Sequence, residues 1–453
     1  MTPAHRDRTG APEGRPSRRL ALALSSALLT AGCAAPHRGT GRPGDPIVLT
    51  LLSHYAAGTL REALQAPVDE WNATHDRVKV RTEAVDFADL LTTYMVRQAA
   101  GRGADILHPY CLWSGQLVRA GVLRPAPPGH AEDIRRGYGP AAVAAASVGG
   151  TVYGYPTEAQ TYALYYNERL LRAAGVDGPP HTWPELEEAA RRTTRRDRYG
   201  NTLVQGFGLS AYDDSTTVGQ TLALLNAAGG RFVTADGTGT GTGTGTAIDS
   251  AAGRAVFALE HRLVAGGASD PGVNVYQAFP SGRVAMVIGA GWWTGSLKPL
   301  MGRDYRDVRV APVPVPRAGD RRATLSTGFM LGVNTASRHP GAAWDFLRWL
   351  NTRKTGPKGR TATRMSTLQV SAGSLTARAD DMRALLGAGS DPNLRPFLDA
   401  LAYAVPEPNV PGAQRAKELL RKNIEALWSG QQSVDEALRT TRRQVDQEVA
   451  RSW

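Results

Sequence analysis

An alternation of strand-like and helix-like segments constrains the fold of this 453-residue chain more than any other feature. Residues 47–52 are continuously apolar and of strand length, which is typical of a strand buried on both faces. A helical pattern follows, and then come a strand at 78–80, a helix at 87–100 and a strand at 104–107. This order predicts a parallel α/β sheet with a ligand cleft at the carboxyl ends of its strands.

The middle and the end of the chain continue the same pattern. Strands are predicted at 162–166, 206–209, 284–288 and 329–333, and helices at 215–228, 250–264, 340–350 and 413–428. Residues 308–315 alternate but contain prolines, so they are expected to be an edge strand or a crossover. Thr182 and Ser433 each lie three residues before a glutamate, so each is expected to open a helix with a capping box. Five Gly-Thr pairs at 237–246 cannot bury a core and predict a surface loop.

The N-terminal end has the pattern of an export signal. Arg18 and Arg19 precede an apolar run at 20–29, which is far shorter than the ~20 residues that a membrane span needs. Thr-Ala-Gly-Cys at 30–33 resembles the lipobox of bacterial lipoproteins, in which the cysteine is lipidated and the signal is removed. An ordinary secretory signal is the alternative, and the arginine pair leaves twin-arginine export open.

The lipobox resemblance implies a signal peptide at 1–32 and a lipid anchor on Cys33. Residues 33–46 are rich in Pro, Gly and polar residues, so they are interpreted as a flexible tether. The mature protein would then lie on the outer face of the cell membrane. With Cys33 acylated, Cys111 has no partner for a disulfide and is expected to be a small buried residue.

Composition indicates a globular protein that does not bind nucleic acid. The formal charge is +12, of which residues 1–32 hold +3. No basic cluster with interleaved aromatic residues accompanies this charge, so it is interpreted as spread over the surface. The length after the signal suggests two or three domains.

The motifs of common enzymes and metal sites are missing from the sequence. The nine histidines are scattered, and there is no Cys-x-x-Cys pair, nucleophile elbow, phosphate-binding loop or dinucleotide-binding fingerprint. The sequence therefore predicts a protein that is not an enzyme and holds no metal or cofactor. A secreted glycoside hydrolase remains an alternative, because Asp213 and Asp214 form an adjacent acidic pair.

Aromatic side chains are the best candidates for a binding site. Several follow predicted strands directly, where a flat ring can lie against the C–H face of a sugar. For any single one of them, packing in the core is the alternative. Trp292 is favoured for binding, because the small residues 289–291 leave space around it. The aromatic candidates are Tyr55, Phe87, Tyr110, Trp113, Tyr212, Trp292 and Trp293.

A set of short stretches resembles the family 1 extracellular solute-binding proteins, which are the sugar receptors of bacterial ABC importers and include maltose-binding proteins. The order and spacing of these stretches over some 400 residues carry the resemblance. They are 68–72, 104–107, 120–123, 152–156, 163–167, 182–183, 282–286, 291–293, 339–340, 343–347 and 433–438. Residues 108–111 depart from the maltose-binding pattern, so maltose itself is not predicted.

The resemblance implies an α/β fold of the type II periplasmic-binding-protein kind, with two hinged lobes and a ligand cleft between them. Lobe 1 would comprise 47–156 and 317–368, and lobe 2 would comprise 157–311 and 369–453. The chain would cross between the lobes near 155–161 and 312–316. Closure of the lobes on the ligand would present the complex to membrane permease subunits.

The resemblance also implies site residues. Trp292 matches the sugar-stacking tryptophan of the family, and Gln160 lies where some members have a hinge carboxylate. The expected ligand is a sugar or oligosaccharide bound by a monomer. A non-sugar ligand (glycerol phosphate, polyamine, peptide or metal) and a sensor role without transport are the alternatives. The other ligand contacts predicted from aromatic placement or cleft loops are His54, Tyr55, Asp86, Tyr110, Trp113, Tyr212, Asp213, Trp293, Gly328 and Asn409.

Overall fold

The computed structural model describes residues 45–56, 58–212, 214–234, 245–356, 359–372, 374–386 and 391–452. The predicted signal peptide, Cys33, Asp213 and most of the Gly-Thr stretch lie outside these ranges. Among the described residues, no helix has both the length and the apolar character needed to cross a membrane.

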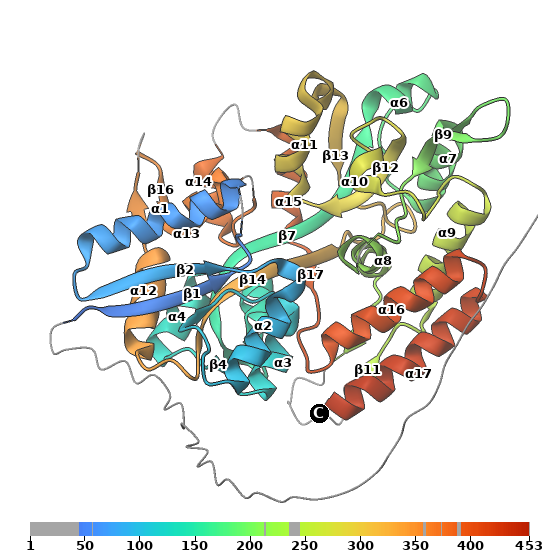
Figure 1. Ribbon diagram of the computed structural model, residues 1–453. Helices are drawn as coiled ribbons and strands as arrows, with labels where there is room; N and C mark the ends of the chain where they lie inside the picture. Colours follow the sequence, from blue (N-terminus) through green and yellow to red (C-terminus); the bar gives the residue numbers. More distant parts are fainter. Residues whose placement is uncertain are drawn as a thin grey trace, which may run out of the picture. The chain divides into compact units, whose positions relative to one another are not determined.

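The N-terminal part forms the parallel sheet that the sequence predicts. β1 (Ile47–Ser53) lies between β2 (Val78–Ala84) and β3 (Ile106–Leu107), and both pairs are parallel. α1 (Gly58–Thr74) connects β1 to β2, and α2 (Phe87–Ala99) connects β2 to β3 (Figure 1). The strand–helix–strand–helix–strand order is therefore confirmed.

One long strand, β7 (Gly154–Asn167), joins the two halves of the sheet. All 14 of its residues are buried, and it crosses the centre of the view in Figure 1. β14 (Thr324–Asn334) pairs with its first half, whereas β12 (Val284–Ala290) and β13 (Val308–Ala311) pair with its second half. The prediction of a short strand at 162–166 was wrong in extent, because β7 continues without a break through the expected crossover.

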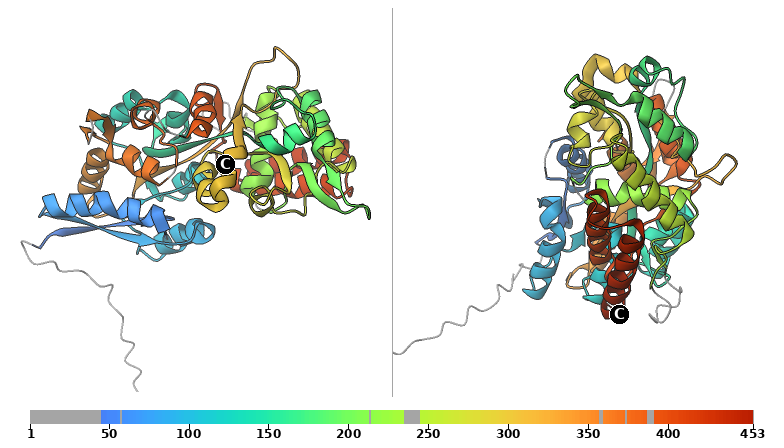
Figure 2. Two further views of the ribbon diagram at one scale, coloured as in Figure 1. Left: turned by 90° about the horizontal axis from the view of Figure 1, so that it is seen from above. Right: turned by 90° about the vertical axis from the view of Figure 1, so that its right-hand side faces the viewer.

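The main path of the sheet has the strand order β2-β1-β3-β14-β7-β12-β9-β8, and β13, β4 and β17 pair with β7 or β14 beside it. Its far edge is formed by β9 (Thr202–Phe207) and β8 (Arg195–Arg196). In Figure 2 the elements around β1 and those around β12 occupy opposite ends of β7, as in a two-lobed α/β fold. The remaining short strands are β4 (Leu123–Arg124), β5 (Ser147–Val148), β6 (Thr151–Val152), β10 (Val233–Thr234), β11 (Gly245–Thr246), β15 (Arg353–Thr355), β16 (Thr361–Thr363) and β17 (Ala404–Pro406).

Helices cover both faces of the sheet. Two of them, α16 (Ala413–Trp428) and α17 (Val434–Ser452), pack side by side at the C-terminal end (Figure 1). The others are α3 (Ser114–Arg119), α4 (Pro128–Gly137), α5 (Pro140–Ala145), α6 (Glu168–Ala173), α7 (Trp183–Thr193), α8 (Asp214–Ala227), α9 (Ala251–Ala265), α10 (Val275–Ala278), α11 (Trp293–Met301), α12 (Pro340–Leu350), α13 (Arg364–Ser371), α14 (Ala379–Leu385) and α15 (Arg395–Ala400). Short 3-10 helices lie at Cys111–Trp113, Gly302–Asp307 and Pro392–Leu394.

Both predicted capping boxes are present. The Thr182 hydroxyl accepts from the backbone N–H of Glu185, and the Glu185 carboxylate accepts from the backbone N–H of Thr182. Ser433 and Glu436 make the same pair of bonds at the start of α17. Each box satisfies two N–H groups that a helix start otherwise leaves without partners.

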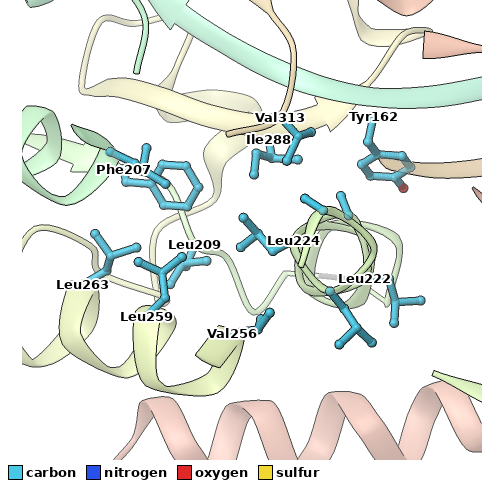
Figure 3. Packing of buried hydrophobic residues seen from close by; sticks show 14 of the residues in the cluster. Tyr162, Phe207, Leu209, Leu222, Leu224, Val256, Leu259, Leu263, Ile288 and Val313 are labelled. Carbon is cyan, nitrogen blue, oxygen red and sulfur yellow. The ribbon is translucent and has the colours of Figure 1, made fainter. Parts of the chain in front are cut away.

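Each lobe has its own hydrophobic core. In lobe 2, α8 lies at the centre of a cluster to which Phe207, Leu224 and Ile288 belong (Figure 3). α16 and α17 close this cluster from the other side through residues such as Leu420 and Val445. In lobe 1, a second cluster packs α1, α4 and α12 against β1 and β14. These separate cores leave the middle of β7 and its neighbours to form the site between them.

Candidate functional site

A cavity of about 770 Å³ lies over the middle of β7, where the two lobes meet. Its lining comes from the loops after β1 and β3, the start of α2, the strands β7 and β14, the start of α11, and α16. Loops that follow β1 and β3 lie at the carboxyl ends of these parallel strands, which is where α/β sheets bind ligands. The predicted position of the cleft agrees with this cavity.

The lobe 1 side of the cavity is an interlocked group of aromatic side chains, here called the first wall. The His54 ring stacks on Phe329 with centroids 4.2 Å apart, and Phe87 stacks on Trp113 at 5.1 Å. Burial lowers the pKa of His54 to about 3, so this ring is neutral at physiological pH. The first wall consists of His54, Tyr55, Phe87, Tyr110, Trp113 and Phe329.

Hydrogen bonds fix the polar atoms of the first wall. The Tyr55 hydroxyl lies 2.9 Å from Gln369 Nε2, which donates to it. Tyr110 donates to the Glu407 carboxylate, and Trp113 Nε1 donates to Gln414 Oε1 at 3.0 Å. The wall is therefore held in place before any ligand arrives.

A buried ion pair between Lys417 and Glu407 stabilises the first wall. Lys417, on α16, lies on the cavity with only 3% of its surface exposed, and its Nζ donates to Glu407 Oε1 at 2.7 Å. The same ammonium lies 5.5 Å from the centre of the Tyr110 ring. Because Glu407 also accepts from Tyr110, one carboxylate connects α16 to the loop after β3.

The lobe 2 side is more exposed and is called the second wall, consisting of Tyr212, Tyr276 and Trp292. The rings of Tyr276 and Trp292 lie 5.6 Å apart, and those of Tyr212 and Tyr276 lie 6.3 Å apart. Trp292 exposes 40% of its surface and Tyr212 exposes 62%. These rings present apolar faces to the space opposite the first wall.

The floor of the cavity is polar and comes mainly from β7. Glu158 Oε2 accepts from Ser374 Oγ at 2.7 Å and from Gln160 Nε2 at 3.1 Å. Burial raises the pKa of Glu158, and these two hydrogen bonds oppose the rise. Gln160 is 3% exposed, and its Oε1 has no hydrogen-bond partner. The floor therefore offers acceptors to a ligand that carries O–H or N–H groups.

A β-bulge places these floor residues. β14 pairs Phe329 with Glu158 but Met330 with Pro156, so Thr157 is the extra residue. Its hydroxyl lies 3.0 Å from His108 Nε2, behind the first wall. Beyond the bulge, the alternation of β7 points Glu158, Gln160 and Tyr162 into the cavity.

Many of the residues predicted from sequence lie together on this cavity. The loops and strand that carry them are far apart in the chain, and the fold brings them to one place. They are His54, Tyr55, Phe87, Tyr110, Trp113, Gln160, Tyr212 and Trp292. Asp213 lies outside the described residues.

Four predicted residues lie away from the cavity lining. Trp293 is 3% exposed and packs in the lobe 2 core against Tyr165, with ring centroids 5.1 Å apart. It starts α11, where neighbouring side chains point in different directions, so only one tryptophan of the pair can face the cavity. Asp86 is an exposed residue just before α2.

The other two residues, Gly328 and Asn409, stabilise the fold and do not line the cavity. A Cβ at Gly328 would lie 2.5 Å from the Glu158 carbonyl oxygen, so this glycine permits the close approach of β14 to β7. Asn409 Nδ2 donates to the carbonyls of Ala145 and Ser147, at 3.0 and 2.6 Å. Asn409 thereby ties the segment before α16 to lobe 1.

Sequence reasoning missed Glu158, Tyr276 and Lys417 as cavity residues. Glu158 lies two positions before Gln160, so the two-residue period of a strand could have found it. Phe329 also lies on the cavity, although the sequence predicts for it only a place in a strand. No pattern in the sequence around Lys417 predicts that it lines the cavity, because its position depends on how α16 packs against the rest of the protein.

The chemistry of the cavity is that of binding. Aromatic rings on two sides and a polar floor can hold a ligand and orient it, as in typical small-molecule sites. Within the described ranges, no three His, Cys, Asp or Glu side chains are grouped as a metal site. Burial raises the pKa of the Cys111 thiol well above its usual value, so this cysteine is unreactive.

Comparison with known proteins identifies the family. The model for bacterial extracellular solute-binding proteins matches residues 57–356. The chain belongs to this family. Its members that carry this description are binding proteins, which agrees with the chemistry of the cavity.

Individual relatives match parts of this solute-binding protein. An uncharacterized lipoprotein of Streptomyces antibioticus is 31% identical over 225 residues, which cover 47% of this chain and 46% of that protein. A maltotriose-binding protein of Pyrococcus abyssi is 29% identical over 140 residues, which cover 28% of this chain and 30% of that protein. The chain thus spans about half, or less, of the length of these curated relatives.

Solved structures match almost the whole solute-binding protein. The cyclic α-maltosyl-1,6-maltose binding protein of Arthrobacter globiformis has a TM-score of 0.73 at 24% identity, covering 90% of this chain and 100% of that one. The GacH receptor of Streptomyces glaucescens has a TM-score of 0.72 at 23% identity, covering 89% and 99%. These similarities show the two-lobed fold.

Proposed function

We propose that the protein captures a sugar or oligosaccharide in the cavity over β7 and delivers it to the permease of an ABC importer. The observation that carries this proposal is the pair of aromatic walls above a floor of hydrogen-bond acceptors. Rings suit the C–H faces of sugars, and acceptors suit their hydroxyls. The names of similar proteins, which include maltotriose, cyclic maltosyl-maltose and acarbose, favour the same ligand class.

Closure of the lobes is the proposed mechanism. A ligand that contacts both walls binds best when they are close, so it shifts the protein toward the closed state. Lobe 1 would comprise 47–156 and 317–368, lobe 2 would comprise 157–311 and 369–453, and 155–161 and 312–316 would be the crossovers. The protein would act as a monomer and without catalysis.

A carbohydrate screen tests the function directly. Thermal-shift measurements on the purified protein should give a rise in melting temperature with at least one sugar of the library. Small-angle scattering with that sugar should give a smaller radius of gyration. Release of product from a chromogenic glycoside panel would instead indicate a hydrolase, and a bound sugar that leaves the radius unchanged would refute closure.

We also propose that Cys33 holds the protein at the outer face of the membrane. The lipobox pattern at 30–33 and the lipoprotein name of the Streptomyces antibioticus relative support this anchor. Replacing Cys33 with Ser should move the protein from the membrane fraction into the medium. Retention of the Cys33→Ser variant in a carbonate-washed membrane fraction would contradict the anchor.

A further inference from the structure

The floor of the cavity contains a buried carboxylate without a basic partner. Glu158 is 8% exposed, and the two side chains that donate to it, Ser374 and Gln160, are neutral. Within the described ranges no Lys, Arg or His forms an ion pair with Glu158, and no basic group contributes to the shift of its pKa. A buried carboxylate without a counter-charge is costly unless a positive group joins it or it takes up a proton.

The other buried carboxylates of the described residues have ionic or hydrogen-bonding partners within the protein. Glu407 pairs with Lys417 at 2.7 Å, and Asp381 pairs with Arg353 at 3.0 Å. Glu260 has no basic partner in the described structure, but it is sealed in the lobe 2 core between Thr221 and Trp428, which both donate to it. Glu158 differs from all three, because it is unpaired and lines a cavity that a ligand can enter.

A second acceptor lies beside this carboxylate. Gln160 Nε2 donates to Glu158, which fixes the orientation of the amide and leaves Oε1 as the group without a partner. Two adjacent acceptors therefore need donors from the ligand. A hydroxyl supplies one donor hydrogen, whereas an ammonium supplies three together with the missing positive charge.

The neighbours of Glu158 do not provide that charge. Tyr55 and Cys111 lie close enough to interact with it electrostatically, and burial raises the pKa of both, so both are neutral. Lys417 and Arg421 line the same cavity, but Lys417 is held by Glu407 and Arg421 donates to Glu425 at 2.8 Å. The basic residues on the cavity are thus engaged with carboxylates other than Glu158.

We propose that Glu158 and Gln160 select a carbohydrate that carries a protonated amino group, so that the ligand class is amino sugars. The inference rests on the proposed capture of carbohydrate and narrows it. The ammonium binds at the floor, where it donates to the Glu158 carboxylate and to Gln160 Oε1. The aromatic walls hold the sugar rings above it.

Matched sugar pairs test this selection by calorimetric titration of the full-length protein. Glucosamine is compared with glucose, galactosamine with galactose, and the β-1,4-linked glucosamine disaccharide with cellobiose, with the N-acetylated forms as uncharged controls. At least one aminated sugar should bind about tenfold or more tightly than its neutral twin, because a charge-assisted hydrogen bond is the stronger kind.

The Glu158→Gln variant tests whether Glu158 causes the preference for aminated sugars. It should weaken binding of the aminated sugar by about tenfold to a hundredfold and weaken binding of the neutral twin by a clearly smaller factor, so that the preference for the aminated sugar falls at least severalfold. Glu260→Gln is the matched control, because it also removes a buried carboxylate but lies away from the cavity. It should leave both affinities as they are in the unchanged protein.

Each other outcome overturns the inference. Equal or tighter binding of the neutral or N-acetylated sugars refutes it and leaves the carbohydrate function standing. A preference that survives in Glu158→Gln refutes the role of this residue. Tighter binding of spermidine than of any amino sugar would show a polyamine site, and a failure of every sugar to bind would refute the proposed function together with the inference.

Discussion

The two walls of the cavity differ in how firmly their aromatic side chains are held. In the first wall, Tyr55, Tyr110 and Trp113 are almost fully buried, and each makes a side-chain hydrogen bond. In the second wall, Tyr212 and Trp292 leave much of their surface uncovered. Phe87, at 39% exposed, is the exception in the first wall. The three hydrogen-bonded rings are preorganised, so ordering them should cost less on binding than ordering the rings of the second wall.

The largest expected effect comes from breaking the ion pair behind the first wall. Lys417→Met leaves the Glu407 carboxylate buried without a positive partner and with the neutral Tyr110 hydroxyl as its remaining donor, so the free energy of unfolding should fall by about 3–5 kcal/mol. Urea titration measures this loss. The double variant with Glu407→Gln removes both charges and should recover much of the stability. A loss below about 1 kcal/mol in the single variant would show that the first wall does not depend on the pair.

The next effect concerns the lobe 2 core around Glu260, away from both walls. Burial raises the pKa of Glu260 to about 7, from 4.5 in the unfolded chain, while Thr221 and Trp428 oppose the rise. The folded protein therefore binds this proton more tightly, and its stability falls as pH rises from about 4.5 to about 7. Glu260→Gln should remove this slope and be more stable above pH 7, by up to about 3 kcal/mol.

Unfolding free energies of the two proteins across pH 4–8 check the prediction, because the titration of all other groups cancels in their difference. A difference that stays constant over this range would contradict it. Sugar affinity of the variant at pH 8 should equal that of the unchanged protein, because Glu260 lies away from the cavity. A changed affinity would show that this core helps to position the second wall.

Trp292→Ala probes the second wall itself. The side chain is exposed and lines the cavity, so its loss should weaken binding of the strongest sugar from the screen by about 2 kcal/mol while stability changes by less than about 1 kcal/mol. Trp293→Ala is the matched control, because it should reduce stability instead. Unchanged sugar affinity in Trp292→Ala would remove the second wall from the site.

The smallest effect compares one hydroxyl from each wall. Tyr110→Phe removes a hydrogen bond to a buried carboxylate, whereas Tyr276→Phe removes the bond that Thr216 donates to the Tyr276 hydroxyl at 2.9 Å. Stability should fall by about 2 kcal/mol for Tyr110→Phe and by about 1 kcal/mol or less for Tyr276→Phe. Thermal unfolding orders the two variants, and the reverse order would contradict the difference between the walls.

Local patterns were sufficient to predict most elements of the fold. Apolar run length gave β1, helical spacing gave α16 with its observed bounds, and the two capping boxes fixed the starts of α7 and α17. The extent of β7 was missed, because its polar residues from Thr157 to Thr161 do not look like a buried strand. They are buried in the fold because β14 lies alongside and the cavity lies above.

Cavity residues could be predicted from the sequence only where they directly follow a predicted strand. Tyr110 and Trp113 follow β3, so the strand-end rule was enough to propose them. Which of Trp292 and Trp293 faces the cavity depends on the direction in which α11 leaves β12. Lys417 reaches the cavity through the docking of α16, which depends on contacts between distant parts of the chain.

The shared strand β7 has a consequence for the time that folding takes. Its partners β12 and β14 lie more than a hundred residues further along the chain, so neither half of the sheet can be completed early in synthesis. Pairings between residues so distant in sequence form slowly, because the intervening chain must first be brought together. The sheet can therefore close only late in folding, after most of the chain has been made.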